Sequence, residues 1–264
     1  MVAGSTVTYR REGPVAVVTI ARPEVRNAVD PSTADALEAA FFRFEGDHEA
    51  RVLVLQGEGE AAFCAGADLR AVAAASFADR FAKAGGPLGI THFEAQKPTI
   101  AAICGYCVAG GLELALWCDL RIAAEGSLFG CTERRFGVPL VDGGTQRLPR
   151  LIGESRALEL ILTGRLIEAR EALAWGLVNE VVPAGSHLRR ALELGHQIAA
   201  FPQETLLADR RLARRALSLP LSEGLALERQ NAAHLADTAS KGARRFAAGE
   251  GRGGAGVERP QQGS

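Results

Sequence analysis

Residues 100–119 combine a short apolar strand, a glycine turn and an apolar helix, and this combination indicates a fold of the α/β class. The run Ile100–Ile103 predicts a buried strand, which Gly105 ends. Two further glycines at 110–111 then open a segment of good helix formers. A strand, a glycine turn and a helix in succession leave unpaired backbone N–H groups directed at the space above the turn. The segment therefore predicts a backbone site for a negatively charged group.

One carboxylate, Glu113, lies in the first turn of this otherwise apolar helix. A helix in a protein core has no structural need for a charge, so Glu113 is either paired with another group or used in chemistry. The glycines that precede it would let a ligand approach the backbone closely. Glu113 is therefore a candidate catalytic residue. Its apolar neighbours argue against the alternative, a solvated position on the helix surface.

The composition of the chain excludes several other functional classes. With 264 residues, of which 47% are hydrophobic, the chain can bury a sizeable core, and one domain with a small appendage is expected. The net charge of −1 and the 6% of aromatic residues indicate neither a nucleic-acid partner nor a polybasic membrane anchor. The sequence shows no leader-like segment and no long uncharged apolar run. We therefore expect a soluble cytoplasmic protein without a membrane partner.

The five cysteines all lie in the first half of the chain, in apolar or glycine-rich surroundings. An odd number without an export signal indicates reduced thiols. Cys104 and Cys107 have the spacing of zinc or redox pairs, but no second pair of ligands follows. We therefore expect these thiols to pack in the core, and we expect no metal site.

Strands and glycine turns alternate with helices up to about Ala184, after which the chain becomes predominantly helical. Val7–Tyr9 and Val15–Ile20 predict a β-hairpin, and Arg51–Gln56 predicts a further buried strand. Between this strand and residue 100, Ala71–Lys83 predicts a weakly patterned helix that could form a mobile wall of the site, and Thr91–Gln96 predicts a short helix. The predicted parts are a catalytic core at 1–184, a helical region at 185–248, and a disordered tail at 249–264.

Several motifs stand in register along the chain. Phe63–Leu69 reads Phe-Cys-Ala-Gly-Ala-Asp-Leu, and Gly105–Glu113 reads Gly-Tyr-Cys-Val-Ala-Gly-Gly-Leu-Glu. An earlier loop, Arg22–Asn27, reads Arg-Pro-Glu-Val-Arg-Asn. The later landmarks are Cys118-Asp119, Gly143–Leu148, Leu162–Gly164 and Ala174–Val178. Taken together, these motifs resemble the crotonase (enoyl-CoA hydratase/isomerase) superfamily over residues 7–183.

The resemblance implies a fold and an assembly. The fold would be a crotonase (ClpP-like) spiral of ββα repeats, followed by a helical C-terminal region for trimerisation. The implied partners are an acyl-CoA thioester as substrate and further copies of the same chain, in a homotrimer or a dimer of trimers. No cofactor is implied, because coenzyme A is part of the substrate.

The resemblance also assigns the binding residues of the site. The backbone amides of Ala67 and Gly110 would form an oxyanion hole for the thioester oxygen, and losing one such donor costs roughly 2.7–4 kcal/mol. The helix that begins near Gly110 would add its positive dipole end. The remaining residues assigned to substrate and coenzyme A are Glu24, Val25, Arg26, Ala65, Asp68, Leu69 and Gly111, with Phe246 closing the acyl pocket.

Two carboxylates would decide the reaction. By resemblance, Glu113 and Glu133 hold a water between them, with Glu133 protonating Cα and Glu113 activating the water as it adds to the α,β-double bond. Paired carboxylates in a pocket can have separated pKa values, so that one donates while the other accepts. Retention of both favours an enoyl-CoA hydratase. The alternatives are another acyl-CoA reaction (isomerisation, dehalogenation or decarboxylation) and a non-catalytic acyl-CoA-binding homologue.

Two departures from the hydratase pattern bear on this interpretation. Asp142 stands directly before Gly143, where typical hydratases carry a small residue. If it enters the pocket, it adds a third carboxylate, which would raise the pKa values of its neighbours or bind a polar acyl group. Arg134 and Arg135 follow Glu133, so the second glutamate could instead form an ion pair with them.

Overall fold

The computed structural model describes residues 5–74 and 78–251, and the chain divides into two compact units, Met1–Ala200 and Phe201–Ser264. The predicted boundary near Ala184 falls earlier than this division. Helix α7 (His187–Ala200) accounts for the difference, because its apolar side chains pack on the sheet of the first unit. Most of the predicted tail, from residue 252 on, lies outside the described residues.

The first unit is built on a six-stranded sheet with the order β1-β2-β3-β5-β7-β10. β1 and β2 form the predicted hairpin, and all other neighbours are parallel. The α/β class is therefore confirmed. The strands are β1 (Val7–Glu12), β2 (Val15–Ile20), β3 (Val52–Gly57), β5 (Thr99–Ile103), β7 (Leu120–Ala124) and β10 (Glu180–Val182).

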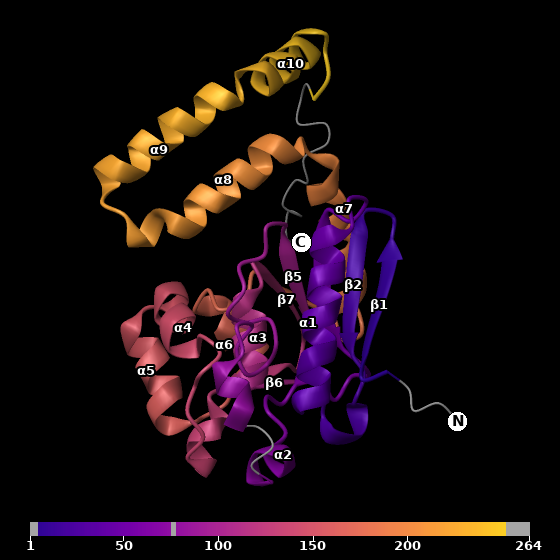
Figure 1. Ribbon diagram of the computed structural model, residues 1–264, viewed down its shortest axis with the longest axis vertical. Helices are drawn as coiled ribbons and strands as arrows, with labels where there is room; N and C mark the ends of the chain where they lie inside the picture. Colours follow the sequence, from indigo (N-terminus) through magenta and orange to yellow (C-terminus); the bar gives the residue numbers. More distant parts are fainter. Residues whose placement is uncertain (1–4, 75–77, 252–264) are drawn as a thin grey trace, which may run out of the picture. The chain divides into compact units, whose positions relative to one another are not determined.

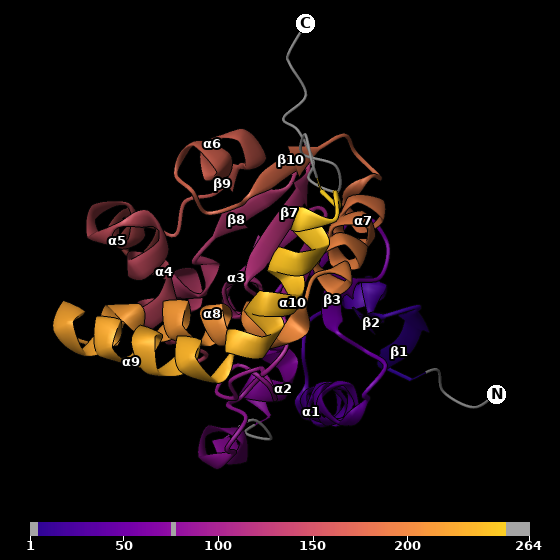
Figure 2. The same ribbon diagram turned by 90° about the horizontal axis from the view of Figure 1, so that it is seen from above.

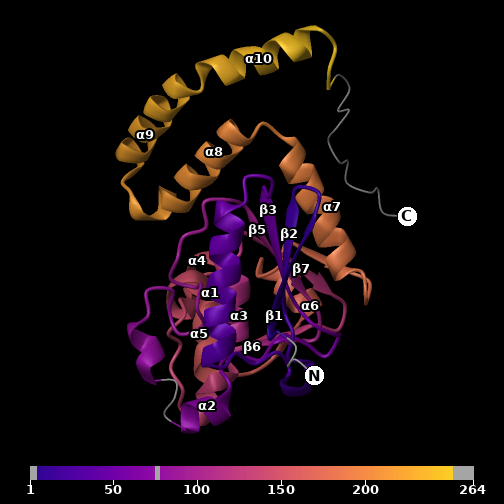
Figure 3. The same cartoon turned by 45° about the vertical axis from the view of Figure 1, so that its right-hand side comes forward.

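Helices cover both faces of this sheet (Figure 3). Successive side chains of a strand point to opposite faces, and β2 is buried along its whole length. Ala16, Val18 and Ile20 pack in the same cluster as helix α1 (Pro31–Gly46), whereas Val15 and Val17 pack with α7. A strand buried on both faces reads as a continuous apolar run, and this run predicted β2 from the sequence.

A second sheet of four short strands brings the two glycine turns together. It consists of β4 (Ala62–Cys64), β6 (Tyr106–Val108), β8 (Leu128–Gly130) and β9 (Ile167–Glu168). β4 and β6 are parallel neighbours with Cys64 opposite Cys107, so the turns that follow them leave the sheet at the same edge. Helix α3 (Gly110–Trp117) starts from the second of these turns.

Further helical segments lie between the strands along the chain of the first unit. Figure 2 shows α5, α6 and β9 on one side of this unit and β1 and β2 on the other. The short segments are η1 (Pro23–Val25), α2 (Leu69–Ala73), η2 (Ala78–Ala82), η3 (Thr132–Phe136), α4 (Gly144–Ile152), α5 (Glu154–Thr163) and α6 (Ala169–Ala174).

Two helix predictions in this unit are wrong. The predicted helix over 71–83 is divided, because α2 ends at Ala73 and η2 is a separate 3-10 turn. The predicted helix over 91–96 is a series of turns, in which the Thr91 hydroxyl donates to Asp142 instead of supporting a helix. Residues 75–77 lie outside the described part, and the mobility of this wall stays a prediction.

The second unit is helical, as predicted, with α8 (Gln203–Arg215) and α9 (Leu221–His234) lying side by side (Figure 1). The 3-10 turn η4 (Ala216–Ser218) follows α8, and α10 (Ala236–Ala247) follows α9. Large apolar side chains are exposed on this unit at Leu217, Leu221 and Phe246. In the described part of the chain, every helix is too short or too polar to cross a membrane.

We expect Gly111→Ala to lower the free energy of unfolding by about 1–3 kcal/mol, as overpacking of a core does. A Cβ at this position would lie 1.9 Å from the Cys64 carbonyl oxygen, so the backbone of β4 would have to move. Thermal and chemical unfolding measure the change. Gly46→Ala is the matched control, because a Cβ there meets nothing within 4 Å. Equal stability of the two variants would contradict the close packing of α3 on β4.

Candidate active site

The first unit encloses a cavity of about 270 Å³ beside the two glycine turns. Seven of the residues predicted for the site line it, namely Ala65, Ala67, Leu69, Gly110, Glu113, Glu133 and Asp142. Ala65 and Asp142 are far apart in the sequence. The pairing of β4 with β6, together with α3, which begins beside both strands, brings them to one cavity.

Ala67 and Gly110, whose amides are predicted to form the oxyanion hole, both line the cavity. A Cβ built on Gly110 would lie 3.6 Å from the Ala67 nitrogen, so the two segments are in close approach. The Gly110 amide belongs to the first turn of α3, where N–H groups lack an acceptor within the helix. Ala109 begins this helix with φ 52°, a conformation that non-glycine residues rarely adopt. Such strained residues concentrate at functional sites.

Glu113 is held in a defined orientation at the cavity wall. Its side chain is 3% exposed, and its Oε1 accepts hydrogen bonds from the amides of Asp142 (3.0 Å) and Gly144 (2.7 Å). A Cβ on Gly144 would lie 2.9 Å from that oxygen, so only glycine leaves room for the contact. The alternative of a solvated helix position is therefore wrong.

The environment of Glu113 raises the pKa of its carboxyl to about 8. Burial is the main cause, and the negative charges of Asp142 and Glu133 add to it, while the two backbone amides oppose it. At neutral pH this carboxyl therefore exchanges a proton readily, which general acid–base catalysis requires.

Glu133 lies on η3 and is 6% exposed. Neither of its carboxylate oxygens has a hydrogen-bond partner among the described residues. The alternative, an ion pair with the following arginines, is not formed, because Arg134 donates to the Ile161 carbonyl and Arg135 to the Gly164 carbonyl. Burial raises the pKa of Glu133, and the positive charge of Arg134 opposes the shift. A buried carboxyl without a partner is costly, and such groups are typical of catalytic sites.

Asp142 does enter the cavity wall, where it is 2% exposed. Its Oδ1 accepts hydrogen bonds from the Leu88 amide (3.0 Å) and from the Thr91 hydroxyl. Burial raises the pKa of this carboxyl, and these hydrogen bonds oppose the shift. Asp142 therefore places a third carboxyl beside Glu113 and also anchors the segment that carries Leu88, another residue of the cavity wall.

Five further predicted binding residues do not line the cavity, namely Glu24, Val25, Arg26, Asp68 and Gly111. Glu24, Val25 and Arg26 form a loop that lies against the first glycine turn, since the Arg26 carbonyl accepts from the Ala65 amide (3.0 Å). Of the remaining predicted residues, Asp68 caps α2 and Gly111 packs on β4.

Phe246, predicted to close the acyl pocket, belongs to the second unit. Its side chain is 63% exposed on α10. Its role at the acyl pocket stays a prediction.

The apolar walls of the cavity are formed by Val72, Phe81, Leu88, Phe136, Val138, Pro139 and Val141. The first two lie in the segment at 71–83 that the sequence predicted as a wall of the site, whereas the others were not identified. For these, the only signal was the apolar content of the loop at 136–141, which is unusual for a loop. Among the described residues, no group of three or more His, Cys, Asp or Glu side chains is arranged to hold a metal ion. All five cysteines are free thiols, and Cys104 is the only one of them that is partly exposed.

The arrangement joins two kinds of group in one small space. Backbone amides and the start of α3 would stabilise negative charge on an oxygen, and two carboxyls with raised pKa values would transfer protons next to it. These are the groups that proton transfer at a carbon next to a carbonyl requires.

Comparison with known proteins identifies relatives along most of the chain. Residues 10–250 match the family described as enoyl-CoA hydratase/isomerase. A carnitinyl-CoA dehydratase of Salmonella typhi is 38% identical over 215 residues, which are 81% of this chain and 82% of that protein. An enoyl-CoA hydratase from Mycobacterium marinum is similar in structure, with a TM-score of 0.85, 34% identity, and coverage of 92% of this chain and 96% of that one. An enoyl-CoA hydratase subunit from Geobacillus kaustophilus has a TM-score of 0.83 and 34% identity, with 98% of each chain covered.

Proposed function

This chain belongs to the enoyl-CoA hydratase/isomerase family, as an acyl-CoA enzyme of the crotonase superfamily, and we propose that it catalyses the reversible addition of water to a 2-enoyl-CoA. The product would be a 3-hydroxyacyl-CoA. The observation that carries the proposal is that Glu113 and Glu133, both buried and both with raised pKa values, line one cavity beside the amides of Ala67 and Gly110.

In the proposed mechanism, the thioester oxygen accepts hydrogen bonds from the amides of Ala67 and Gly110. As water adds at Cβ, negative charge develops on this oxygen, and fixed amide dipoles stabilise it more strongly than mobile water would. The start of α3 contributes in the same direction. No cofactor beyond the coenzyme A of the substrate takes part in this scheme.

The proton transfers are divided between the two carboxyls. The ionised form of Glu113 takes a proton from water, since its Oε1 is fixed by two amides and the raised pKa makes this carboxylate a stronger base. Glu133 delivers a proton to Cα, and its raised pKa favours the protonated form that this step needs. The active enzyme carries one proton on the pair, and the pair titrates as a unit.

The test is a direct assay of hydration. Crotonyl-CoA and longer straight-chain 2-enoyl-CoAs lose the absorbance of the conjugated thioester when water adds to them. We expect turnover that depends on both glutamates. Binding of these thioesters without turnover would overturn the proposal and favour another acyl-CoA reaction or a binding protein.

A second candidate is the hydration and dehydration of an acyl group that carries a quaternary ammonium. The similarity to carnitinyl-CoA dehydratase suggests it, since carnitine is a 3-hydroxy acid with a trimethylammonium group. The described lining of the cavity favours it as well, because it includes Phe81, Phe136 and three carboxyls but no lysine, arginine or histidine. Aromatic faces and carboxylates are the groups that recognise such cations. A higher kcat/KM for the 4-trimethylammonium derivative of crotonyl-CoA than for crotonyl-CoA itself would support this candidate over the first.

We expect Asp142→Asn to shift the pH profile of kcat/KM to lower pH. Asparagine keeps an oxygen that can accept from Leu88 and Thr91, but it removes a negative charge that raises the Glu113 pKa. Initial rates measured across the pH range test this shift, and superimposable profiles would contradict it.

The same charge affects stability. The pKa of Glu113 is raised in the folded state. Its contribution to the free energy of unfolding is therefore fully present below the unfolded pKa and is lost as the pH rises through about 8. In Asp142→Asn the loss of unfolding free energy should be smaller and should be complete at a lower pH. Chemical unfolding at a series of pH values, from below the unfolded pKa to above pH 8, measures the difference.

Self-association through the second unit is part of the same proposal. The exposed side chains of Leu217, Leu221 and Phe246 give that unit an apolar surface suited to another copy of the chain. Light scattering coupled to gel filtration measures the mass, and a monomer at micromolar concentration would overturn this part.

A further inference from the structure

The direction of the Ala67 amide is set by a short parallel bridge behind it. Val29 donates to the Gly66 carbonyl (2.8 Å), and Asp68 donates to the Val29 carbonyl (2.9 Å). The Ala67 N–H belongs to the same planar trans peptide unit as the Gly66 carbonyl, so the two groups point in opposite directions. The Ala67 N–H therefore points away from Val29 and toward the side on which Gly110 lies.

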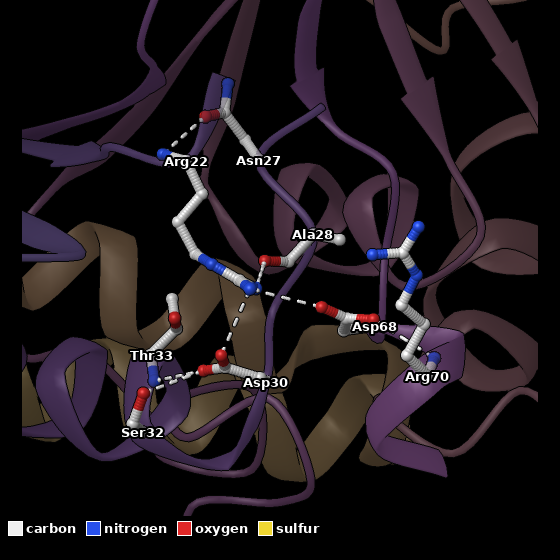
Figure 4. Close-up of polar contacts among 8 residues, drawn as sticks. All are labelled: Arg22, Asn27, Ala28, Asp30, Ser32, Thr33, Asp68 and Arg70. Atoms are coloured by element: carbon white, nitrogen blue, oxygen red, sulfur yellow. Dashed lines mark hydrogen bonds and ion pairs between the residues drawn. The ribbon is translucent and has the colours of Figure 1, made fainter. Parts of the chain in front are cut away.

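Arg22 joins the two sides of this bridge (Figure 4). Its Nη2 lies 3.1 Å from an oxygen of Asp30 and 3.1 Å from an oxygen of Asp68. Its Nη1 donates to the Ala28 carbonyl (2.6 Å). The two aspartates flank the bridge, one after Val29 and the other after Ala67, so one guanidinium holds both strands of the bridge together. Only arginine offers several donors in a fixed plane for such a set of acceptors.

Both aspartates are already held by the helices that they begin. Asp30 accepts from the Thr33 amide (2.8 Å) at the start of α1, and Asp68 accepts from the Arg70 amide (3.0 Å) at the start of α2. Figure 4 shows the Arg22 side chain reaching between the two. The guanidinium therefore connects the oxyanion turn to the ends of two helices.

The backbone at Arg22 is fixed as well. The buried Asn27 side chain accepts from the Arg22 amide (3.0 Å) and donates to the Ala62 carbonyl (2.7 Å) at the start of β4. Arg26 and Asn27 both have positive φ values, 55° and 56°, which fold the loop back onto β4. Through Asn27, the backbone of Arg22 is therefore held against β4, the strand that leads into the Ala67 turn.

We propose that Arg22 is a positioning residue for the oxyanion site, acting through Asp30 and Asp68 to keep the Ala67 N–H directed at the thioester oxygen. The inference rests on the proposed use of that amide. It assigns to Arg22 a function in the transition state, although its side chain does not line the cavity.

Two variants of Arg22 test the proposal. Arg22→Gln removes the positive charge and the planar set of N–H donors. We expect kcat to fall by about 10–100-fold with KM changed by less than about twofold, because a small misplacement of a catalytic group has effects of this size. Arg22→Lys keeps the positive charge but not the planar set of donors, so its kcat should lie between those of Arg22→Gln and the wild type. Arg190→Gln is the matched control. Arg190 is 19% exposed against 14% for Arg22, also contacts two carboxylates, and lies on α7.

A spectroscopic readout separates positioning from general loss of structure. Acetoacetyl-CoA ionises to an enolate that absorbs in the near ultraviolet, and oxyanion donors favour this form. We expect a smaller enolate fraction of bound acetoacetyl-CoA in Arg22→Gln than in the wild type. This readout does not require hydration, so absence of turnover in the wild type would overturn the proposed function while the enolate fraction still tests Arg22.

Asp68→Asn completes a double-mutant cycle. Asparagine can still accept from Arg70, but the ion pair is lost, so the double variant should lose no more kcat than Arg22→Gln alone. Additive losses would overturn the proposal. A normal enolate fraction in Arg22→Gln, or a kcat within twofold of the wild type, would overturn it as well.

Discussion

Glu133→Gln is expected to lower kcat for enoyl-CoA hydration by about 10²–10⁴-fold, the usual contribution of a general acid or base. Glutamine has nearly the same shape but cannot deliver a proton to Cα. KM should change little, because the carboxyl acts on the reacting atoms and not on coenzyme A. Steady-state kinetics with crotonyl-CoA measures both constants. Glu49→Gln, at an exposed position after α1, is the control and should leave kcat unchanged.

Stability distinguishes loss of catalysis from loss of structure in this variant. The wild-type carboxylate is buried without a hydrogen-bond partner among the described residues, so ionising it opposes folding. Glu133→Gln removes that charge and should unfold at the same temperature as the wild type or above it at alkaline pH. Wild-type kcat in Glu133→Gln would contradict the two-carboxyl mechanism.

Glu113→Gln should lower kcat by a similar factor, since Glu113 and Glu133 act on the same water and substrate. Groups that act as a unit have non-additive effects, so the double variant should lose little more than the worse single variant. The amide oxygen of the new glutamine side chain can still accept from Asp142 and Gly144, which keeps the local backbone in place.

The glycine turns beside the cavity could be predicted from the sequence, because they depend on backbone geometry. Glycines at 105, 110 and 111 are required where a side chain would collide with neighbouring backbone or fill the space between the turns. This requirement is visible in the sequence as a pattern of glycines. Glu113 was equally visible, because a charged side chain among apolar helix residues rarely serves packing alone.

Features that depend on long-range packing were not predictable in the same way. The sequence could not show whether Asp142 faces solvent or the cavity, because its partners at Leu88 and Thr91 lie about fifty residues earlier in the chain. Glu133 precedes two arginines, so the sequence left a surface ion pair open as an alternative, and only the burial of the Glu133 side chain argues against it. The amphipathic pattern of α7 predicted a helix but not the face of the sheet on which it packs.

The other large effect is expected at the proposed oxyanion hole, where Ala67→Pro should lower kcat by about 10²–10³-fold. Proline has no N–H, so the thioester oxygen would lose one of its two donors. Gly66, the preceding residue, has φ 90° and belongs to the residue type least restricted by a following proline. The flanking bridge uses the Gly66 carbonyl and the Asp68 amide, so it survives the change.

Ala67→Val controls for the added volume, because valine has about the bulk of proline and keeps the N–H. Ala67 lines the cavity, so both variants should raise KM by similar factors. Only Ala67→Pro should also lose kcat and the enolate fraction of bound acetoacetyl-CoA. Equal losses of kcat in the two variants would show that volume, and not the amide, limits the reaction. A kcat for Ala67→Pro within tenfold of the wild type would mean that the oxygen is held elsewhere. The Gly110 amide at the start of α3 would then remain as the donor to be tested.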